Sequence, residues 1–465
     1  MSVESPASPV APPAPRGLSG LLARAPVPAL VAFSMAAAFV TYFCMYSFRK
    51  PFDATEFNAH AADGSLVLTG QGKAVPLKFA GSPVDLKTMC VIAQVIGYML
   101  SKYLGTRICS EVPGRFRGWL MLGLIVWAGC ALALFGVLPP DLKPLAMLLN
   151  GLPLGMVWGL CIRYLEGRRT TELMIAGLSC SYVVAGAITR DVGRDLVMTQ
   201  WGVPEEFMPA ATGLLFLLPF ALGVWLLNQI PPPTIADTAA RGERKEMSRA
   251  TRWAFLRHYG LGFGLLLAAY FFLTMFRDFR DHYGKEIFRT LGYGDGKAIF
   301  TQTEWPAGFS VLAALACLFL IRRHKAALVA VYTVIIGGFA LVGVSAVLYL
   351  TGVIDGFWMM LLFAIGLYLA YVPYGAMLFE RMMAASRFVG TAAFAIQLAD
   401  GVGYTGSVII QLLRDFVFGE FDRLWFVVRL GLLVSVAGVL LMTASGILCV
   451  RRAKPATETP SGVVK

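Results

Sequence analysis

Residues 231–257 read PPPTIADTAARGERKEMSRATRWAFLR, and this proline-led, basic stretch divides the chain into two strongly hydrophobic halves. On both sides of it, hydrophobic runs are long enough to cross a bilayer core of about 30 Å, which takes about 20 helical residues. We place these runs at 28–48, 86–106, 118–138, 143–163, 171–190 and 208–230, and at 258–276, 299–321, 326–350, 356–379, 388–413 and 425–450. The sequence therefore predicts an all-α membrane protein of about 12 transmembrane helices in two six-helix halves.

The composition excludes an ordinary soluble protein, because 57% of the residues are hydrophobic and the mean hydropathy is +0.68. The predicted spans use most of the 465 residues, so no separate soluble domain of normal size remains and any function must lie within the helix bundle. We predict a disordered cytoplasmic tail at 1–26, an N-terminal half at 27–230, a cytoplasmic linker at 231–257, a C-terminal half at 258–450 and a second cytoplasmic tail at 451–465.

The net charge of +12 is distributed as expected for a membrane protein rather than for a nucleic-acid-binding protein. Basic residues gather in loops that lie on one side of the predicted bundle, including 107–117, 163–169, 231–257 and 322–325. The positive-inside rule assigns that side to the cytoplasm. We expect a multi-pass protein of the cell inner membrane with both termini cytoplasmic, surrounded by lipid, without a nucleic-acid partner and monomeric.

Motifs for enzyme chemistry are missing from the sequence. There is no GxxxxGK[ST] loop for ATP, and neither HExxH nor GxSxG occurs. The eight cysteines show no metal-binding spacing, and the four histidines lie outside the predicted spans or, for His258, at the first residue of one. We therefore expect no catalytic residues, no metal and no cofactor, and any transport would be secondary.

Two arginines hold matching places in the two halves. Arg49 follows the first span in YSFRKPF, and Arg277 follows the seventh in FLTMFRDFRD. Guanidinium groups bind oxyanions through planar, bidentate hydrogen bonds, so the pair predicts recognition of a phosphate or carboxylate between the halves. Snorkelling to the membrane surface is the alternative for both. Lys102, in GYMLSKYLG of the second span, would add a third positive charge or would itself snorkel.

Ionisable groups inside the spans are costly and are functional candidates by default. Asp400, in AIQLADGVGYTG, falls near the middle of the eleventh span, so it must be paired, hydrated or protonated. Glu304, in TQTEWPAGF, would pair with a nearby cation or carry a proton. Arg190 and Asp191 favour a mutual or interhelical ion pair. Lys87, at a span end, is interpreted as a snorkelling residue.

The two halves resemble the arrangement of the major facilitator superfamily, in which six-helix repeats surround a site near the midplane. Within it, the motifs around Arg49, Lys102, Arg277 and Glu304 resemble those of the organophosphate:phosphate antiporters, which include the glycerol-3-phosphate and hexose-phosphate carriers. The resemblance implies that the two arginines bind substrate phosphate, that Lys102 is the lysine of the cavity and that Glu304 is the eighth-helix glutamate.

The same resemblance adds two tyrosines to the expected substrate site. Tyr46 lies in the counterpart of the family's tyrosine-rich first helix, and Tyr182 stands where the family carries a histidine in the fifth helix. The loop TRICSEVPGRFRG lacks the superfamily's Gly-x-x-x-Asp-Arg pattern, and Asp400 and Arg190 have no recognised counterpart. These departures favour a related carrier whose site suits a different anion.

Three functions follow from these observations. The first is secondary active transport of an organic anion, expected to be phosphorylated, by alternating access. The second is proton-coupled transport of another solute, with Asp400 or Glu304 as the proton carrier. The third is a membrane sensor or scaffold that keeps the fold and does not transport.

The predicted orientation is tested with reporter fusions after Arg168, Arg249 and Arg323. All three should report a cytoplasmic location, because each follows a basic loop on the side that the positive-inside rule assigns to the cytoplasm. A fusion after Leu142, in an opposite loop, is the control and should report the other side. A periplasmic signal from any of the first three fusions would contradict the predicted order of the spans.

Overall fold

The computed structural model describes residues 17–59, 65, 67, 75–82, 84–168, 170–234, 237, 249–293, 296, 298–321, 323–386, 392–413 and 422–452. Most of the predicted linker and the outer parts of both predicted tails, residues 1–16 and 453–465, lie outside this part of the chain.

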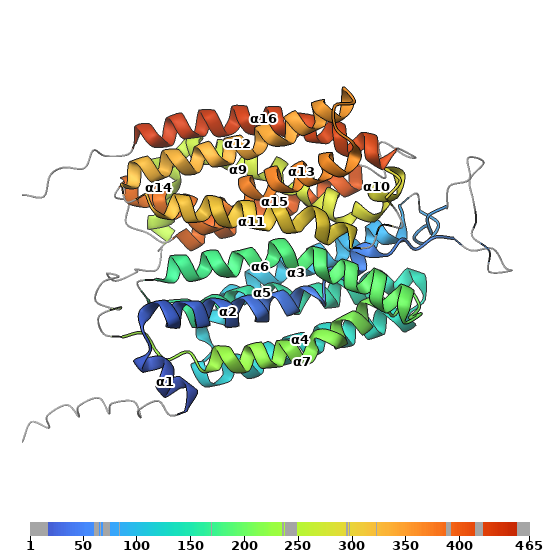
Figure 1. Ribbon diagram of the computed structural model, residues 1–465, viewed down its shortest axis with the longest axis horizontal. Helices are drawn as coiled ribbons and strands as arrows, with labels where there is room; N and C mark the ends of the chain where they lie inside the picture. The colour runs from blue at the N-terminus through green and yellow to red at the C-terminus, as the bar shows by residue number, and fades with distance from the viewer. Residues whose placement is uncertain are drawn as a thin grey trace, which may run out of the picture.

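The N-terminal half is built from long helices that run side by side along the longest axis of the molecule (Figure 1). They are α2 (Val27–Tyr46), α3 (Leu86–Glu111), α4 (Gly114–Val137), α5 (Lys143–Leu165), α6 (Thr171–Asp191) and α7 (Met208–Asn228). Four short elements accompany them: α1 (Leu18–Arg24), η1 (Pro51–Ala54), η2 (Pro140–Leu142) and the π-helix η3 (Val192–Gln200).

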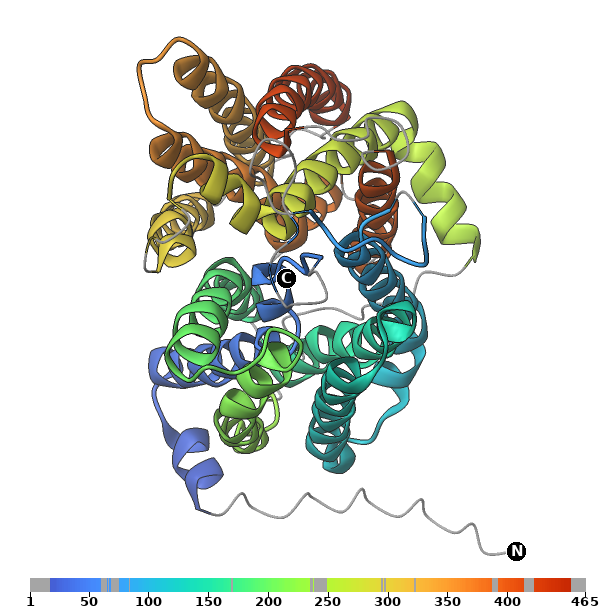
Figure 2. The same ribbon diagram turned by 90° about the vertical axis from the view of Figure 1, so that its right-hand side faces the viewer.

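The C-terminal half repeats this construction and lies beside the first, as the separate blue-to-green and yellow-to-red layers of Figure 1 and the end view of Figure 2 show. Its long helices are α9 (Arg249–His282), α11 (Ile299–Phe319), α12 (His324–Leu350), α13 (Gly356–Pro373), α15 (Ala392–Leu413) and α16 (Arg423–Arg451). Shorter ones are α10 (Gly284–Thr290), the π-helix η4 (Tyr374–Leu378) and α14 (Phe379–Ser386).

In the described part of the chain, 9 helices are long and apolar enough to cross a membrane. The remaining long helices α3, α11 and α15 stand where the second, eighth and eleventh spans were predicted. These helices carry Lys102, Glu304 and Asp400 among their apolar residues. The prediction of an all-α membrane protein is confirmed. The three less apolar helices each carry one of the charged residues that the sequence singled out.

Two of the predicted boundaries differ from the observed helices. Residues 18–24, placed in a disordered tail, form helix α1. Helix α9 begins at Arg249, inside the predicted linker, and its path breaks at Gly260. Gly260 has a φ of 43°, which glycine adopts without the steric penalty that a side chain imposes. The basic stretch before the seventh span is therefore partly helical and changes direction at this residue.

Close packing of α3 against α5 positions the inner side of the N-terminal half. A Cβ atom added at Gly151 would overlap the backbone carbonyl of Gln94, so only glycine permits this approach. Next to it, the buried Asn150 side chain accepts a hydrogen bond of 2.8 Å from Gln94 and donates one of 3.0 Å to the carbonyl of Phe48. This contact fixes the chain that follows α2 and thereby the position of Arg49.

Each half has its own buried hydrophobic core, with few residues shared between the two. Tyr404 of the C-terminal half packs into the core of the N-terminal half, whereas Val183 and Ala187 pack into the core of the C-terminal half. The halves are thus separate packed bodies that meet along a narrow seam. Apolar packing between α6 and α11 and polar contacts both join them along this seam.

Candidate functional site

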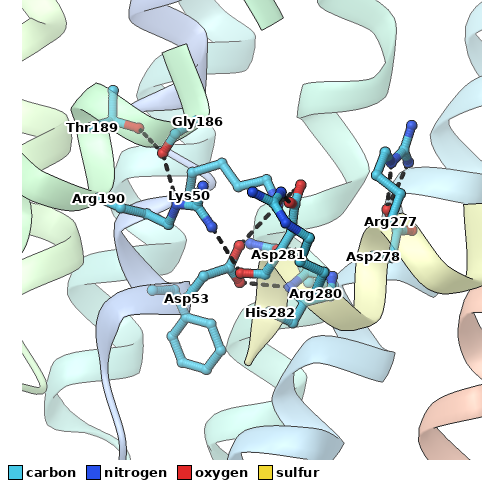
Figure 3. Close-up of polar contacts among 12 residues, drawn as sticks. Lys50, Asp53, Gly186, Thr189, Arg190, Arg277, Asp278, Arg280, Asp281 and His282 are labelled. Carbon is cyan, nitrogen blue, oxygen red and sulfur yellow. Dashed lines mark hydrogen bonds and ion pairs between the residues drawn. The ribbon is translucent and has the colours of Figure 1, made fainter. Parts of the chain in front are cut away.

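Buried ion pairs join the two halves at one end of the bundle, and Figure 3 draws several of them. We call this region the interlocked end. It consists of the described residues within 50–56, 85–87, 190–195 and 280–304. Lys50 lies 2.9 Å from Asp53 of its own half and 3.6 Å from Asp281 of the other. Asp53 in turn lies 2.6 Å from Nδ1 of His282. All four side chains are buried, so the end of α9 is held against the turn that follows α2.

A second group of pairs connects α6 with α11 at the same end. Arg190 lies 2.5 Å from Glu304 and donates a hydrogen bond of 2.8 Å to the backbone carbonyl of Asp281. Arg280 approaches the same oxygen of Glu304 at 3.5 Å. The prediction that Arg190 takes part in an interhelical ion pair agrees with this geometry. Its partner is Glu304, so neither residue lies next to Arg49 or Arg277.

Lys87 of α3 makes a further buried connection and does not snorkel, as its place at a span end suggested. Its ammonium group lies 2.9 Å from Glu286 of α10 and donates 3.1 Å to the backbone carbonyl of Asp53. Its side chain is 3% exposed. The snorkelling interpretation is wrong because Lys87 has an acid across the seam that removes the need to reach water.

Two acidic groups of the interlocked end lie in short elements between spans. Burial opposes the ionisation of Asp53, yet His282 and Lys50 hold the pKa of its carboxyl well below the usual value. Burial also opposes the ionisation of Glu286, but Lys87 and Arg423 lower the pKa of that carboxyl below its usual value. Both carboxyls are therefore ionised at neutral pH.

Farther along the seam, tyrosine side chains and one tryptophan contact one another, the Tyr42 and Tyr98 hydroxyls at 3.4 Å included. We call this set the aromatic belt, and it lies between the two halves rather than at the membrane surface. Its members are Tyr42, Tyr46, Tyr98, Trp158, Tyr182, Tyr270, Tyr371 and Tyr404. The belt crosses between the halves twice, through Tyr98 and Tyr404 at 5.5 Å between ring centroids and through Tyr182 and Tyr371 at 6.0 Å. Tyrosine presents both a flat apolar face and a polar hydroxyl, so the belt suits an amphipathic ligand.

Cations lie against the faces of this belt. The guanidinium of Arg49 lies 4.1 Å from the centre of the Tyr98 ring, and that of Arg277 lies 4.0 Å from the centre of the Tyr371 ring. Lys102, on the same helix as Tyr98, lies 5.3 Å from the centre of that ring. The two predicted arginines therefore point to one aromatic belt from opposite halves, which is not the geometry of snorkelling.

The two arginines differ in their acidic partners. Both Nε and Nη2 of Arg277 donate to one oxygen of the adjacent Asp278, at 2.9 and 2.6 Å, and Ser407 donates to the other oxygen. Figure 3 shows Arg277 and Asp278 apart from the charges of the interlocked end. Among the described residues no acid lies within ion-pair distance of Arg49, although Asp278 acts on its charge from farther away, and the buried Nε of Arg49 has no hydrogen-bond partner. Arg49 is thus the cation in the belt with capacity for an added anion.

Asp400 also belongs to the belt and is not isolated inside the bilayer. It lies 3.5 Å from Lys102 across the seam and accepts a hydrogen bond of 2.9 Å from the hydroxyl of Tyr270. Lys102 stands 15 positions after Lys87 on α3, or about 22 Å along the helix, so this pair is remote from the interlocked end. Of the three states that its position allowed, Asp400 is in the paired one.

The structure thus divides the predicted residues into two groups. Arg49, Arg277, Lys102, Tyr46, Tyr182 and Asp400 gather at the aromatic belt, whereas Glu304 and Arg190 belong to the interlocked end. Sequence reasoning missed most of the belt tyrosines and the role of Asp278. The adjacency of Arg277 and Asp278 in FRDFRD was the one available signal.

In the part of the chain described, no group of His, Cys, Asp or Glu side chains could hold a metal ion.

Comparisons with known proteins place the chain in a family. Residues 77–452 match the family described as "Family of unknown function (DUF5690)". The chain belongs to this family. No curated protein matches the sequence. The family region includes the second to twelfth predicted spans, so it contains the described aromatic belt except for the residues contributed by α2 and the turn after it.

Among solved structures, this member of the DUF5690 family is similar to a crystal structure of a mutant of the nucleoside transporter NupG. The match has a TM-score of 0.55 at 12% sequence identity and covers 90% of this chain and 99% of that one. At this identity the likeness shows the fold alone. It confirms a multi-pass membrane protein with a fold of the major facilitator type.

The ion pair between Lys87 and Glu286 gives a test of the interlocked end. Lys87→Met leaves a buried carboxylate without its cation, so we expect it to destabilise the protein by about 3–5 kcal/mol, which is typical of a broken buried pair. Lys78→Met is the control, because Lys78 pairs with Asp85 but is 47% exposed, and its loss should change stability by less than about 1 kcal/mol. Thermal unfolding of the detergent-purified protein measures both. Equal effects would contradict a special role of the buried pair.

Proposed function

We propose that the protein is a secondary transporter that moves an organic anion across the membrane by alternating access. The observation that supports this most is the buried guanidinium of Arg49, which lies on the Tyr98 ring at the seam and has no acid within ion-pair distance among the described residues. A cation held between two movable halves is expected to bind an anion that enters from either side.

A phosphorylated metabolite is the first substrate class that we propose. Arginine forks bind phosphate oxygens in a bidentate manner, and the motifs around Arg49 and Arg277 resemble those of the organophosphate:phosphate antiporters. The structural neighbour is a nucleoside transporter, and the aromatic belt of this protein would also accept a flat ring. An uncharged nucleoside would leave Arg49 without a counter-ion, so an anion satisfies the site better.

The polar seam supports the proposed movement. At the interlocked end several ion pairs cross between the halves, whereas the belt has the partly exposed Lys102–Asp400 pair. With the proposed orientation, in which both termini face the cytoplasm of a cell with an inner membrane, the interlocked end faces outward. The structure then represents a carrier whose outer entrance is closed.

Counterflow in proteoliposomes tests the function. Vesicles loaded with inorganic phosphate are given labelled phosphate outside, together with a panel of sugar phosphates, carboxylates and nucleosides as competitors. We expect wild-type uptake that anions inhibit. Arg49→Lys, which keeps the charge but loses the planar fork, should reduce uptake by about 10- to 100-fold, equivalent to roughly 1.5–3 kcal/mol of charge-assisted hydrogen bonding.

Arg323→Lys is the matched control for that experiment, because Arg323 is exposed outside the seam. It should transport normally. Arg277→Lys should also lower uptake, but by less than Arg49→Lys, since Asp278 already takes up part of the Arg277 fork. Normal transport by Arg49→Lys would contradict a bidentate contact. If purified, folded protein exchanges none of the panel, the sensor or scaffold becomes the better interpretation.

Proton-coupled transport is the second candidate function, and the partly exposed pair of Lys102 and Asp400 favours it. Their side chains are 23% and 19% exposed, so water reaches a carboxylate that lies within the belt. A proton on Asp400 would release Lys102 from its partner and change the charge of the site.

Asp400→Asn separates coupling from binding. If Asp400 carries the proton, the variant should lose accumulation driven by a pH gradient and keep exchange of substrate, because exchange needs no net proton movement. If Asp400 only balances Lys102, anion affinity should change at every pH. Accumulation and exchange are measured side by side in the same vesicles. Unchanged values in both assays would show that neither role applies.

A further inference from the structure

We propose that His282 and Asp53 form a proton-binding site that locks the interlocked end, so that acidic pH holds the two halves together there. This inference rests on the proposed alternating access, because a lock matters only if the halves separate. It concerns residues that lie outside the aromatic belt and that the transport site does not use. The ligand of the site is a proton.

The geometry of the pair is that of an imidazole held by a carboxylate in a closed interface. Nδ1 of His282 lies 2.6 Å from Oδ1 of Asp53, and both side chains are 1% exposed. Asp53 belongs to η1 of the N-terminal half, whereas His282 is the last residue of α9 in the C-terminal half. The contact therefore exists only while the halves are together at this end.

The groups around the imidazole come from several elements, and acids among them face His282 most directly. From the N-terminal half, Asp53 contacts it, while Lys50 and Lys87 bind the carboxylate and the backbone carbonyl of Asp53. On its own helix, Asp278 and Asp281 lie one turn or less away, and the former is held by Ser407 of α15. Glu286 of α10 is neutralised by Lys87, and Arg423 of α16 lies over the neighbouring Tyr283.

The other charges of the cluster balance one another without a proton on the imidazole. Lys50, Arg190 and Arg280 form ion pairs with Asp53, Asp281 and Glu304. Histidine is the side chain whose charge ordinarily changes between about pH 5 and 8. The imidazole of His282, which contacts Asp53 across the seam, is the place at which the proposed lock takes up its proton.

Linkage gives the direction of the effect. A proton on His282 is stabilised by the Asp53 carboxylate only in the closed arrangement, so protonation favours closure of the interlocked end. By the same coupling, separation of the halves lowers the affinity of His282 for a proton and releases it. Raising the pH should therefore increase the population in which this end is open.

Distances between spin labels across the interlocked end test the proposal without any substrate. Labels are attached at Leu142→Cys and Val353→Cys, which are exposed loop positions of the two halves, at 48% and 68%. Cys109, Cys130 and Cys317 are replaced by serine, and the full chain is placed in lipid nanodiscs. We expect the population with a long distance to rise at least about threefold between pH 5.5 and pH 8.0.

Two variants remove the site in different ways. His282→Gln keeps a polar side chain without a titrating group, and Asp53→Asn keeps His282 but removes the charge that stabilises its proton. Both should show a distance distribution that no longer depends on pH and that contains more of the long distance at pH 5.5. His324→Gln is the control, because His324 is exposed at the start of α12 and should leave the wild-type response unchanged.

The outcomes separate the lock from the transport proposal. A pH response that persists in His282→Gln or in Asp53→Asn overturns the proton site, even if the other variant fails to fold. If the halves of the wild type separate to the same extent at every pH, the proton site is also overturned, whereas alternating access is not. A wild type whose halves stay together at every pH, with or without phosphate and the competitor panel, contradicts both proposals.

Discussion

Ionised side chains lose most of their hydration when they are buried between membrane helices, and this loss governs where the charges of this protein lie. A cation enclosed in the seam is stable only beside an acid or another strong acceptor. Lys50, Lys87 and Arg190 each meet an acid from the opposite half. The same requirement makes Arg49 exceptional, because its guanidinium lies on a tyrosine face and no acid among the described residues is within ion-pair distance.

The seam therefore has two regions with different chemistry. At the interlocked end the charges satisfy one another, so this region favours contact between the halves and has little capacity for a ligand. At the aromatic belt the rings supply shape and Arg49 has no acid within ion-pair distance among the described residues, so an anionic ligand would complete the region. The distance along α3 between Lys87 and Lys102 keeps the two regions apart. Binding and closure can thus be altered separately by substitution.

Much of the fold could be predicted from the sequence, since hydrophobic length is a local property that each span carries by itself. The arginines of the belt were also predictable, because a charge next to a span stands out against apolar neighbours. Pairing was not predictable in this way. Lys87 and Glu286 are 199 positions apart, so the sequence around Lys87 does not show that an acid lies beside it in the folded protein. The same holds for Asp53 and His282, each of which looked like an ordinary loop or span-end residue.

The tyrosines of the belt were missed for a different physical reason. In a membrane helix a tyrosine is compatible with the apolar core, the headgroup region and a polar site, so its presence alone does not distinguish these environments. Tyr371 and Tyr404 become informative only when the packing of α13 and α15 brings them to the seam. Asp278 was visible beside Arg277, but the backbone conformation decides whether neighbouring side chains meet or diverge.

Several buried ion pairs are divided between the two halves, and this also limits how the protein can change over generations. A mutation that removes Glu286 leaves Lys87 charged and buried, and a mutation that removes Glu304 takes away the acid that pairs with Arg190. Such changes become tolerable when a second mutation arises in the opposite half. Descendants of this sequence should therefore carry coordinated replacements at these positions, and a chimaera that joins halves from distant relatives should fail at the seam before it fails in either core.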